Sequence, residues 1–199
     1  MTTALGAPRP LGYGERVTES TPSPRSQPQY QIRFDWGLKG AAAIAEGAHI
    51  VVWVDALTTA LAPDPLLITH EVAILRGTVG NCDALAAWIL DRQVELGDRA
   101  TVAVVAAGAD DGGFAVEDLL AAGAVIDALA EVGIDYISPE AAAAVGAFTG
   151  LRNATSHVLS ASVSGQLLVA ERGREFIDEA KTANAGQALN VVREFVLSA

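Results

Sequence analysis

The sequence contains a single cysteine, Cys82, and few basic residues. One cysteine excludes an intramolecular disulfide and a metal site built from several cysteines. Lys and Arg total 13 against 24 Asp and Glu, they form no cluster, and the net charge is −11. We therefore expect neither a nucleic-acid backbone nor an anionic membrane surface as a partner. A small anion remains compatible with the sequence, because a metal ion or a locally positive site can hold it.

Long apolar runs and several well-known catalytic motifs are also absent. No apolar run is long enough to span a bilayer, and the N-terminus lacks the basic stretch and apolar core of a secretory signal, so we expect a cytoplasmic protein. The sequence has no Gly-Xaa-Gly-Xaa-Xaa-Gly fingerprint, no Gly-Lys-Ser/Thr phosphate loop and no Gly-Xaa-Ser-Xaa-Gly elbow. A dinucleotide site, a P-loop and a serine hydrolase are thereby disfavoured.

Alanine and valine dominate what is present. The chain of 199 residues is 51% hydrophobic but only 6% aromatic, and small side chains allow helices to pack closely on a sheet. Most of the prolines lie in residues 1–28, which therefore predict a disordered or loosely packed tail. Residues 29–199 are long enough for a single domain with its own core.

Apolar runs alternate with helical patterns along this domain. Strands are predicted at 30–34, 49–54, 71–75, 101–105 and 190–197, with a loop from Arg76 to Gly80. Helices are predicted at 36–46, 81–96, from 116 onward, at 138–150, at 151–160, from Ser164 to about 171, and at 173–182. The order predicts an α/β fold of three layers, α/β/α, with a mostly parallel sheet and helices clustered toward the C-terminus.

The stretch from Thr101 to Ile126 carries the strongest functional pattern. A strand with the composition of one buried on both faces runs into the acidic, glycine-rich segment Gly108–Gly113, and a helix follows that opens with Glu117-Asp118. Ligands of open α/β sheets bind at the carboxyl ends of strands. Carboxylates there can hold a hard cation, and helix N-terminal amides favour an anion. The alternative is a solvated loop whose acids simply complement the helix dipole.

Five further residues lie at element ends. Asp55 follows the second strand, Asn81 is a natural N-cap, and Cys82 stands at a helix start, where a thiol pKa can fall. Ser164 and Gly165 offer a further helix start to an anion. Asp55 is also explained as a turn residue, and Asn81 as a plain N-cap. We expect Asp55, Asn81, Gly108 and Glu117 to lie on one edge of the sheet.

The order of several segments resembles the 2-phosphosulfolactate phosphatase family, enzymes that release phosphate from phosphosulfolactate on the way to coenzyme M. The matching segments cover most of residues 30 to 180: IRFDWGLKGA, VVWVDALTTAL, GNCDALAAWI, VAVVAAG with AVEDLLAAGAVIDAL, SPEAAAAVGAF and SVSGQLLVAERG. The resemblance implies an α/β fold, a magnesium ion and hydrolysis of a phosphate monoester on a small 2-hydroxy acid. It implies that Asp55 binds Mg²⁺ or attacks phosphorus, and that Glu117 and Asp118 are metal ligands or water-orienting acids. From their places at strand ends and helix starts, Asn81, Cys82, Gly108, Ser164 and Gly165 are candidates for binding the phosphorylated substrate.

The sequence departs from the family at three places. A proline turn between Ala62 and Glu71 replaces a longer insert, Ala109-Asp110 replaces a charged and aromatic pair, and Gln166-Leu167 replaces an Arg-Glu pair. Glutamine lacks the charge and the donor fork of arginine. Two functions are therefore carried forward: a Mg²⁺-dependent phosphatase, and a non-catalytic family member that binds a small anion or a protein partner. A homo-oligomer is compatible with either.

Overall fold

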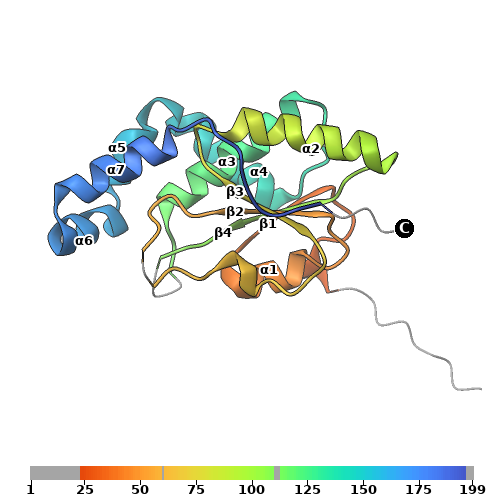
Figure 1. Cartoon of the computed structure of the whole chain (residues 1–199), viewed down its shortest axis with the longest axis horizontal. Helices are drawn as coiled ribbons and strands as arrows, with labels where there is room; N and C mark the ends of the chain where they lie inside the picture. The colour runs from red at the N-terminus through yellow and green to blue at the C-terminus, as the bar shows by residue number, and fades with distance from the viewer. Residues whose placement is uncertain (1–22, 60, 110–112, 196–199) are drawn as a thin grey trace, which may run out of the picture.

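The computed structural model describes residues 23–59, 61–109 and 113–195, and the strands among them form one five-stranded sheet (Figure 1). The strands are β1 (Ile32–Trp36), β2 (Ile50–Val54), β3 (Ala73–Gly77), β4 (Val102–Ala106) and β5 (Asn190–Arg193), in the spatial order β1-β4-β2-β3-β5. The first four are parallel, and β5 pairs antiparallel with β3 at the edge. The predicted α/β class and mostly parallel sheet are confirmed.

Helices cover both faces of the sheet, which confirms the three layers. Figure 1 shows α1 on one face and α2, α3 and α4 on the other, while α5, α6 and α7 lie together beyond one end of the sheet. Their bounds are α1 (Gly37–Ile44), α2 (Cys82–Leu96), α3 (Val116–Glu131), α4 (Pro139–Leu151), α5 (Thr155–Ala161), α6 (Val163–Arg172) and α7 (Arg174–Asn184). No helix within the described residues is both long and apolar enough to cross a membrane.

The apolar residues of the central strands divide between the two faces because side chains alternate along a strand. Val52 and Val54 pack in the core that contains residues of α2, α3 and α4. Val51 and Trp53 pack in the smaller core on the side of α1. All five residues of β2 are buried, and the same holds for β4. The continuous apolar runs in the sequence therefore mark strands covered on both sides.

Two element boundaries differ from the prediction. β3 extends to Gly77, so Arg76 belongs to a strand rather than to a loop. α6 begins at Val163, because the hydroxyl of Ser162 accepts a hydrogen bond from the Gly165 amide at 3.0 Å and caps the helix. Ser164 therefore lies inside the first turn and does not open the helix.

The last residues of the predicted tail contact β1. The side-chain amide of Gln27 donates to the Phe34 carbonyl oxygen at 2.8 Å and accepts from the Phe34 amide at 3.0 Å. Arg25 forms an ion pair with Asp35 at 2.7 Å. These contacts hold residues 25–27 against β1, at the outer edge of the sheet. Residues 1–22, the rest of the predicted tail, lie outside the described residues.

The chain leaves β2 and β4 toward opposite faces of the sheet. After β2, Ile68 and Val72 pack on the side of α1, whereas after β4 the chain enters α3 on the other side. Adjacent parallel strands with such divergent connections leave a crevice at their carboxyl ends. Ala56 and Leu57, just past β2, join a separate small core with residues of α5, α6 and α7. The C-terminal helices therefore pack against the segment that follows β2, at this end of the sheet.

Candidate active site

A cleft of about 730 Å³ lies at the carboxyl ends of β2 and β4, and we call it the carboxylate cleft. Three of its lining residues are the acids singled out in the sequence, Asp55, Glu117 and Asp118. Its larger apolar lining residues are Leu57, Phe114, Val163, Leu167 and Leu168, and Gly108 and Ser164 also line it. The loop after β2 and the first turn of α3 thus bring the predicted acids together in space.

The Asp118 side chain links the segment after β2 to the segment after β4. Its Oδ1 accepts a hydrogen bond from the Ala56 amide at 2.7 Å, and its Oδ2 accepts one from the Gly108 amide at 2.9 Å. The side chain is 2% exposed. Burial raises the pKa of Asp118 well above the usual carboxyl range, and the charges of Asp55 and Glu117 raise it further, while the two amides act in the opposite direction. Asp118 is therefore held by the backbone, with an oxygen on each loop.

Glu117 is bonded differently from Asp118. It is 4% exposed, and its Oε2 is buried without a hydrogen-bond partner among the described residues. Burial of such an oxygen raises the free energy of the folded state, because the oxygen loses its hydrogen bonds to water and accepts none in their place. Asp55, half-buried at the end of β2, lines the same cleft. Glu117 is thus the acid best placed to gain from a cation or a donor entering the cleft.

Gly108 has a backbone role in the cleft. Its φ is +81°, and a Cβ there would come 2.9 Å from the carbonyl oxygen of Gly113. A side chain at this position is therefore both strained and crowded. Gly108 was predicted to bind the phosphorylated substrate, but its amide donates a hydrogen bond to Asp118.

Ser164 and Gly165 have different roles. Ser164 lines the carboxylate cleft. Gly165 is buried, and a Cβ added to it would collide with the carbonyl oxygen of Leu159. Gly165 therefore serves the close packing of α6 on α5, and its amide is occupied by Ser162.

Asn81 lies at the same edge of the sheet as Asp55, Gly108 and Glu117, but it lines a different cavity from Gly108 and Glu117. Its Oδ1 accepts from the Thr78 amide at 2.8 Å, and its Nδ2 donates to the carbonyl oxygens of Arg76 at 3.0 Å and Ala188 at 3.3 Å. These bonds join the loop after β3 to the segment before β5. The Asn81 side chain therefore uses both its amide oxygen and its amide nitrogen in hydrogen bonds to the backbone rather than to a phosphate.

Cys82 is the clearest departure from the sequence-based expectation. Its thiol donates to the Val79 carbonyl oxygen at 3.2 Å, and Cys82 lines neither this cleft nor the cavity of Asn81. Burial and the neighbouring charge of Asp83 raise the pKa of the Cys82 thiol to about 11. The helix start does not compensate for these effects, so Cys82 is a protonated, structural residue.

The donors of the carboxylate cleft fit a magnesium ion in chemistry, but not as a cage of three acids. Within the part of the chain that the structure describes, no group of three or more His, Cys, Asp or Glu side chains is arranged to hold a metal. Mg²⁺ is commonly held by one or two carboxylates, with water and substrate phosphate completing its shell. Asp55 and Glu117 can supply that number of carboxylates, whereas Asp118 already accepts two backbone hydrogen bonds.

The residues of the cleft that the structure describes offer no positive side chain to an anion. None of its described lining residues is Lys, Arg or His. Gln166, which stands where the resembled family has arginine, is exposed, does not line the cleft, and donates to the Ala161 carbonyl oxygen at 2.8 Å. A phosphate bound here would therefore meet no positive side chain among the described lining residues.

A family model described as 2-phosphosulpholactate phosphatase matches residues 43–195. The chain belongs to this family. The match runs from within α1 past β5 and so includes the carboxylate cleft and every candidate residue named above. Membership implies a function like that of the 2-phosphosulpholactate phosphatases in general terms, and it supports the hydrolase class predicted from the sequence. A comparison with curated proteins found no match.

A second cavity of about 400 Å³, which we call the Arg76 cavity, lies at the carboxyl end of β3. Arg76, Trp53, Asn81 and Asn184 line it, and Asp55 lines both cavities. The sequence analysis missed Arg76 and Asn184. A charged residue at the end of the apolar run 71–75 was the available signal for Arg76, but Asn184 gave none, because only the packing of α7 brings it to this place.

Proposed function

We propose that the protein hydrolyses the phosphate monoester of a small 2-hydroxy acid in the carboxylate cleft, with Mg²⁺ as cofactor. One observation carries the proposal: Asp55, Glu117 and Asp118 line a single cleft, and the Glu117 Oε2 has no hydrogen-bond partner among the described residues. A buried carboxylate without a partner beside two other acids favours a cation as occupant.

Each acid has a separate role in this proposal. Asp55 and Glu117 hold the cation, and Asp118 positions the loops after β2 and β4 through the Ala56 and Gly108 amides. A bound Mg²⁺ supplies charge neutralisation on the phosphoryl oxygens. In the hydrolysis, a water oxygen bonds to phosphorus and the ester P–O bond breaks. One proton of the water passes to the released alkoxide and gives the 2-hydroxy acid, and the other product is phosphate. The chain contributes the rigid placement of its acids at the ends of two central strands.

The apolar residues of the cleft are suited to the organic part of the substrate. Phe114 is 66% exposed, Leu167 is 65% exposed and Val163 is 74% exposed, although all three are large apolar side chains. Exposed apolar side chains around a polar floor are typical of ligand pockets. A substrate with a small apolar group beside its phosphate would bury part of this surface.

A second candidate function is a non-catalytic member that binds a small anion. It is favoured by the side chain of Gln166, which faces Ala161 and leaves the cleft without the charge of an arginine. The two candidate functions differ in catalysis: the phosphatase hydrolyses a phosphate ester, whereas the non-catalytic member only binds its ligand.

Phosphate release separates them. We expect the protein to release phosphate from 2-phospholactate in the presence of Mg²⁺ and not in the presence of EDTA, and the Glu117→Gln variant to lose most of this activity. If no phosphate is released above the protein-free blank with Mg²⁺, the non-catalytic function is preferred. If Glu117→Gln retains full activity, the role of Glu117 in holding the cation is wrong.

A further inference from the structure

The Arg76 cavity contains a guanidinium that has no hydrogen-bond or ion-pair partner among the described residues. Arg76 is half-buried near the end of β3 and lines the cavity. Its guanidinium makes no hydrogen bond or ion pair with any residue that the structure describes. An arginine in a concave site offers a planar fork of N–H donors that matches a carboxylate or a phosphate. The missing partner therefore points to an anionic group of a ligand.

Two further polar atoms around this cavity have no partner. The indole Nε1 of Trp53 and the Oδ1 of Asn184 are both buried, and neither forms a hydrogen bond within the described residues. One is a donor only and the other an acceptor only. Buried polar groups in native proteins are nearly always paired, so each unpaired group needs an explanation. A ligand with an acceptor and a donor would satisfy both.

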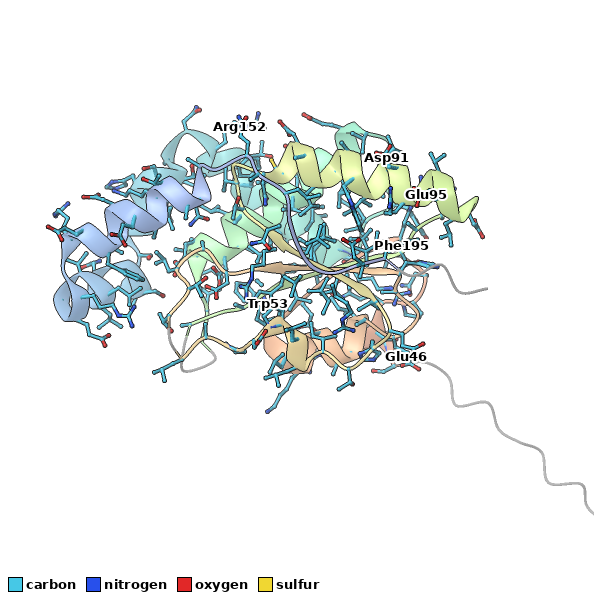
Figure 2. All side chains as sticks on the ribbon, viewed as in Figure 1. Glu46, Trp53, Asp91, Glu95, Arg152 and Phe195 are labelled. Carbon is cyan, nitrogen blue, oxygen red and sulfur yellow. The ribbon has the colours of Figure 1, made fainter. Side chains whose placement is uncertain are left out.

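These groups are carried on rigid parts of the fold. Arg76 and Trp53 are register partners on β3 and β2, so their side chains project from the same face of the sheet, the face of α1. Figure 2 labels Trp53 on that side of the sheet. The Nδ2 of Asn184 donates to the carbonyl oxygens of Ala56 at 2.6 Å and Ala180 at 3.0 Å, which fixes the direction of its Oδ1. The arrangement is built before any ligand arrives.

We infer that the Arg76 cavity binds a small carboxylate that also carries a hydrogen-bond donor, a hydroxyl or an amino group. The carboxylate pairs with the guanidinium of Arg76 and accepts from the Trp53 indole, and the donor group bonds to Asn184. Glu179 and Asp55 also line the cavity, and their charges disfavour a ligand with several negative groups. The cavity adjoins the carboxylate cleft at Asp55, which lines both, and binding of a carboxylate there does not depend on the proposed phosphatase activity.

The binding test uses metal-free protein and three small probes. Lactate and alanine each carry a carboxylate and a donor, whereas acetate carries the carboxylate alone. We expect lactate or alanine to raise the melting temperature and to change tryptophan fluorescence at millimolar concentration, with acetate at least tenfold weaker. Arg76→Gln should abolish the effect, Arg76→Lys should restore part of it, and Arg99→Gln, which removes an exposed guanidinium elsewhere, should leave it unchanged.

The same variants separate a ligand site from a structural role. Arg76 has no partner to lose, so the Arg76→Gln protein without ligand should melt at the same temperature as the parent or higher. The inference is overturned if no probe shifts either signal, if Arg76→Gln binds as well as the parent, or if Arg76→Gln melts clearly lower without ligand.

Phosphate release then identifies the source of the carboxylate. If lactate competes with the phosphate ester, raising KM with kcat unchanged, the cavity holds the carboxylate of the substrate itself. If lactate changes kcat or has no effect on turnover while still binding, the cavity serves a separate ligand. Both results support the inference, and binding without any phosphatase activity would overturn the proposed function alone.

Discussion

Adjacent acids of α3 should respond in opposite ways to loss of charge. Asp118→Asn keeps one oxygen to accept from one of the Ala56 and Gly108 amides, but it presents an NH₂ group to the other. A buried amide left without an acceptor costs about 1–3 kcal/mol of unfolding free energy. Relief of repulsion from Asp55 and Glu117 offsets part of this cost, so we expect a loss near the lower end of that range. Asp118→Ala leaves both amides unpaired and should cost about 2–6 kcal/mol on the same basis.

Glu117→Gln is the matched control one residue away. The Oε2 of Glu117 has no hydrogen-bond partner among the described residues, so the substitution removes a charge and breaks no bond from that atom. We expect a change within about 0.5 kcal/mol, or a gain in stability. Urea unfolding of the three variants in EDTA, at one pH, measures both predictions. If Glu117→Gln destabilises the protein as much as Asp118→Asn, then Asp118 is not distinguished as the residue that positions the loops and Glu117 is not the acid available to a cation. That result would refute our assignment.

Three further predictions concern other parts of the chain. Iodoacetamide should alkylate Cys82 in the folded protein about 100-fold more slowly near neutral pH than in urea, because raising the thiol pKa from 9.0 to about 11 removes most of the thiolate; equal rates would contradict a buried, protonated thiol. A chain shortened to start at Gln29 should unfold at lower urea concentration than one that starts at Ser23, because it loses the hydrogen bonds of Gln27 to Phe34; coincident transitions would show that this contact contributes nothing. Leu167→Asp should weaken turnover of phenyl phosphate more than Mg²⁺ binding, since Leu167 lines the cleft without being a candidate ligand; an equal loss of both would place it in the metal site.

Much of the fold is encoded in local patterns. Runs of small β-branched residues predict the buried strands, and Ser138-Pro139 predicts the start of α4, where the Ser138 hydroxyl accepts from the Ala141 amide. Gly97 ends α2 in the left-handed conformation that glycine adopts most easily. These features depend on neighbours in the sequence, so they are visible without coordinates.

Other features depend on contacts between distant segments, and the sequence does not reveal them. Arg33 is an example: it is 5% exposed, and its guanidinium donates to the carbonyl oxygens of Ile44 and Glu46 at the end of α1. Alternation alone predicts only that its side chain points away from Ile32. The pairing of Asn184 with Ala56 spans 128 residues and is equally hidden.

The candidate site was predicted in part for the same reason. Asp55 follows a strand and Glu117 opens the next helix, and these positions predicted that both would lie on one edge of the sheet. They did not show that Asp118 would bind two backbone amides, or that burial would outweigh the helix start at Cys82 and raise its thiol pKa. Side-chain partners and burial, which decide the chemistry of a group, appear only in the folded structure.

Direct Mg²⁺ binding tests the central claim, that Asp55 and Glu117 hold a cation while Asp118 holds the loops. The measurement is the melting temperature of the parent, Glu117→Gln and Asp118→Asn proteins, each titrated with Mg²⁺ after treatment with EDTA. We predict that Mg²⁺ raises the melting temperature of the parent by mass action and has little effect on Glu117→Gln. Asp118→Asn should begin from a lower melting temperature and still respond to Mg²⁺. Equal responses of the parent and Glu117→Gln, or no response of the parent at all, would contradict the claim.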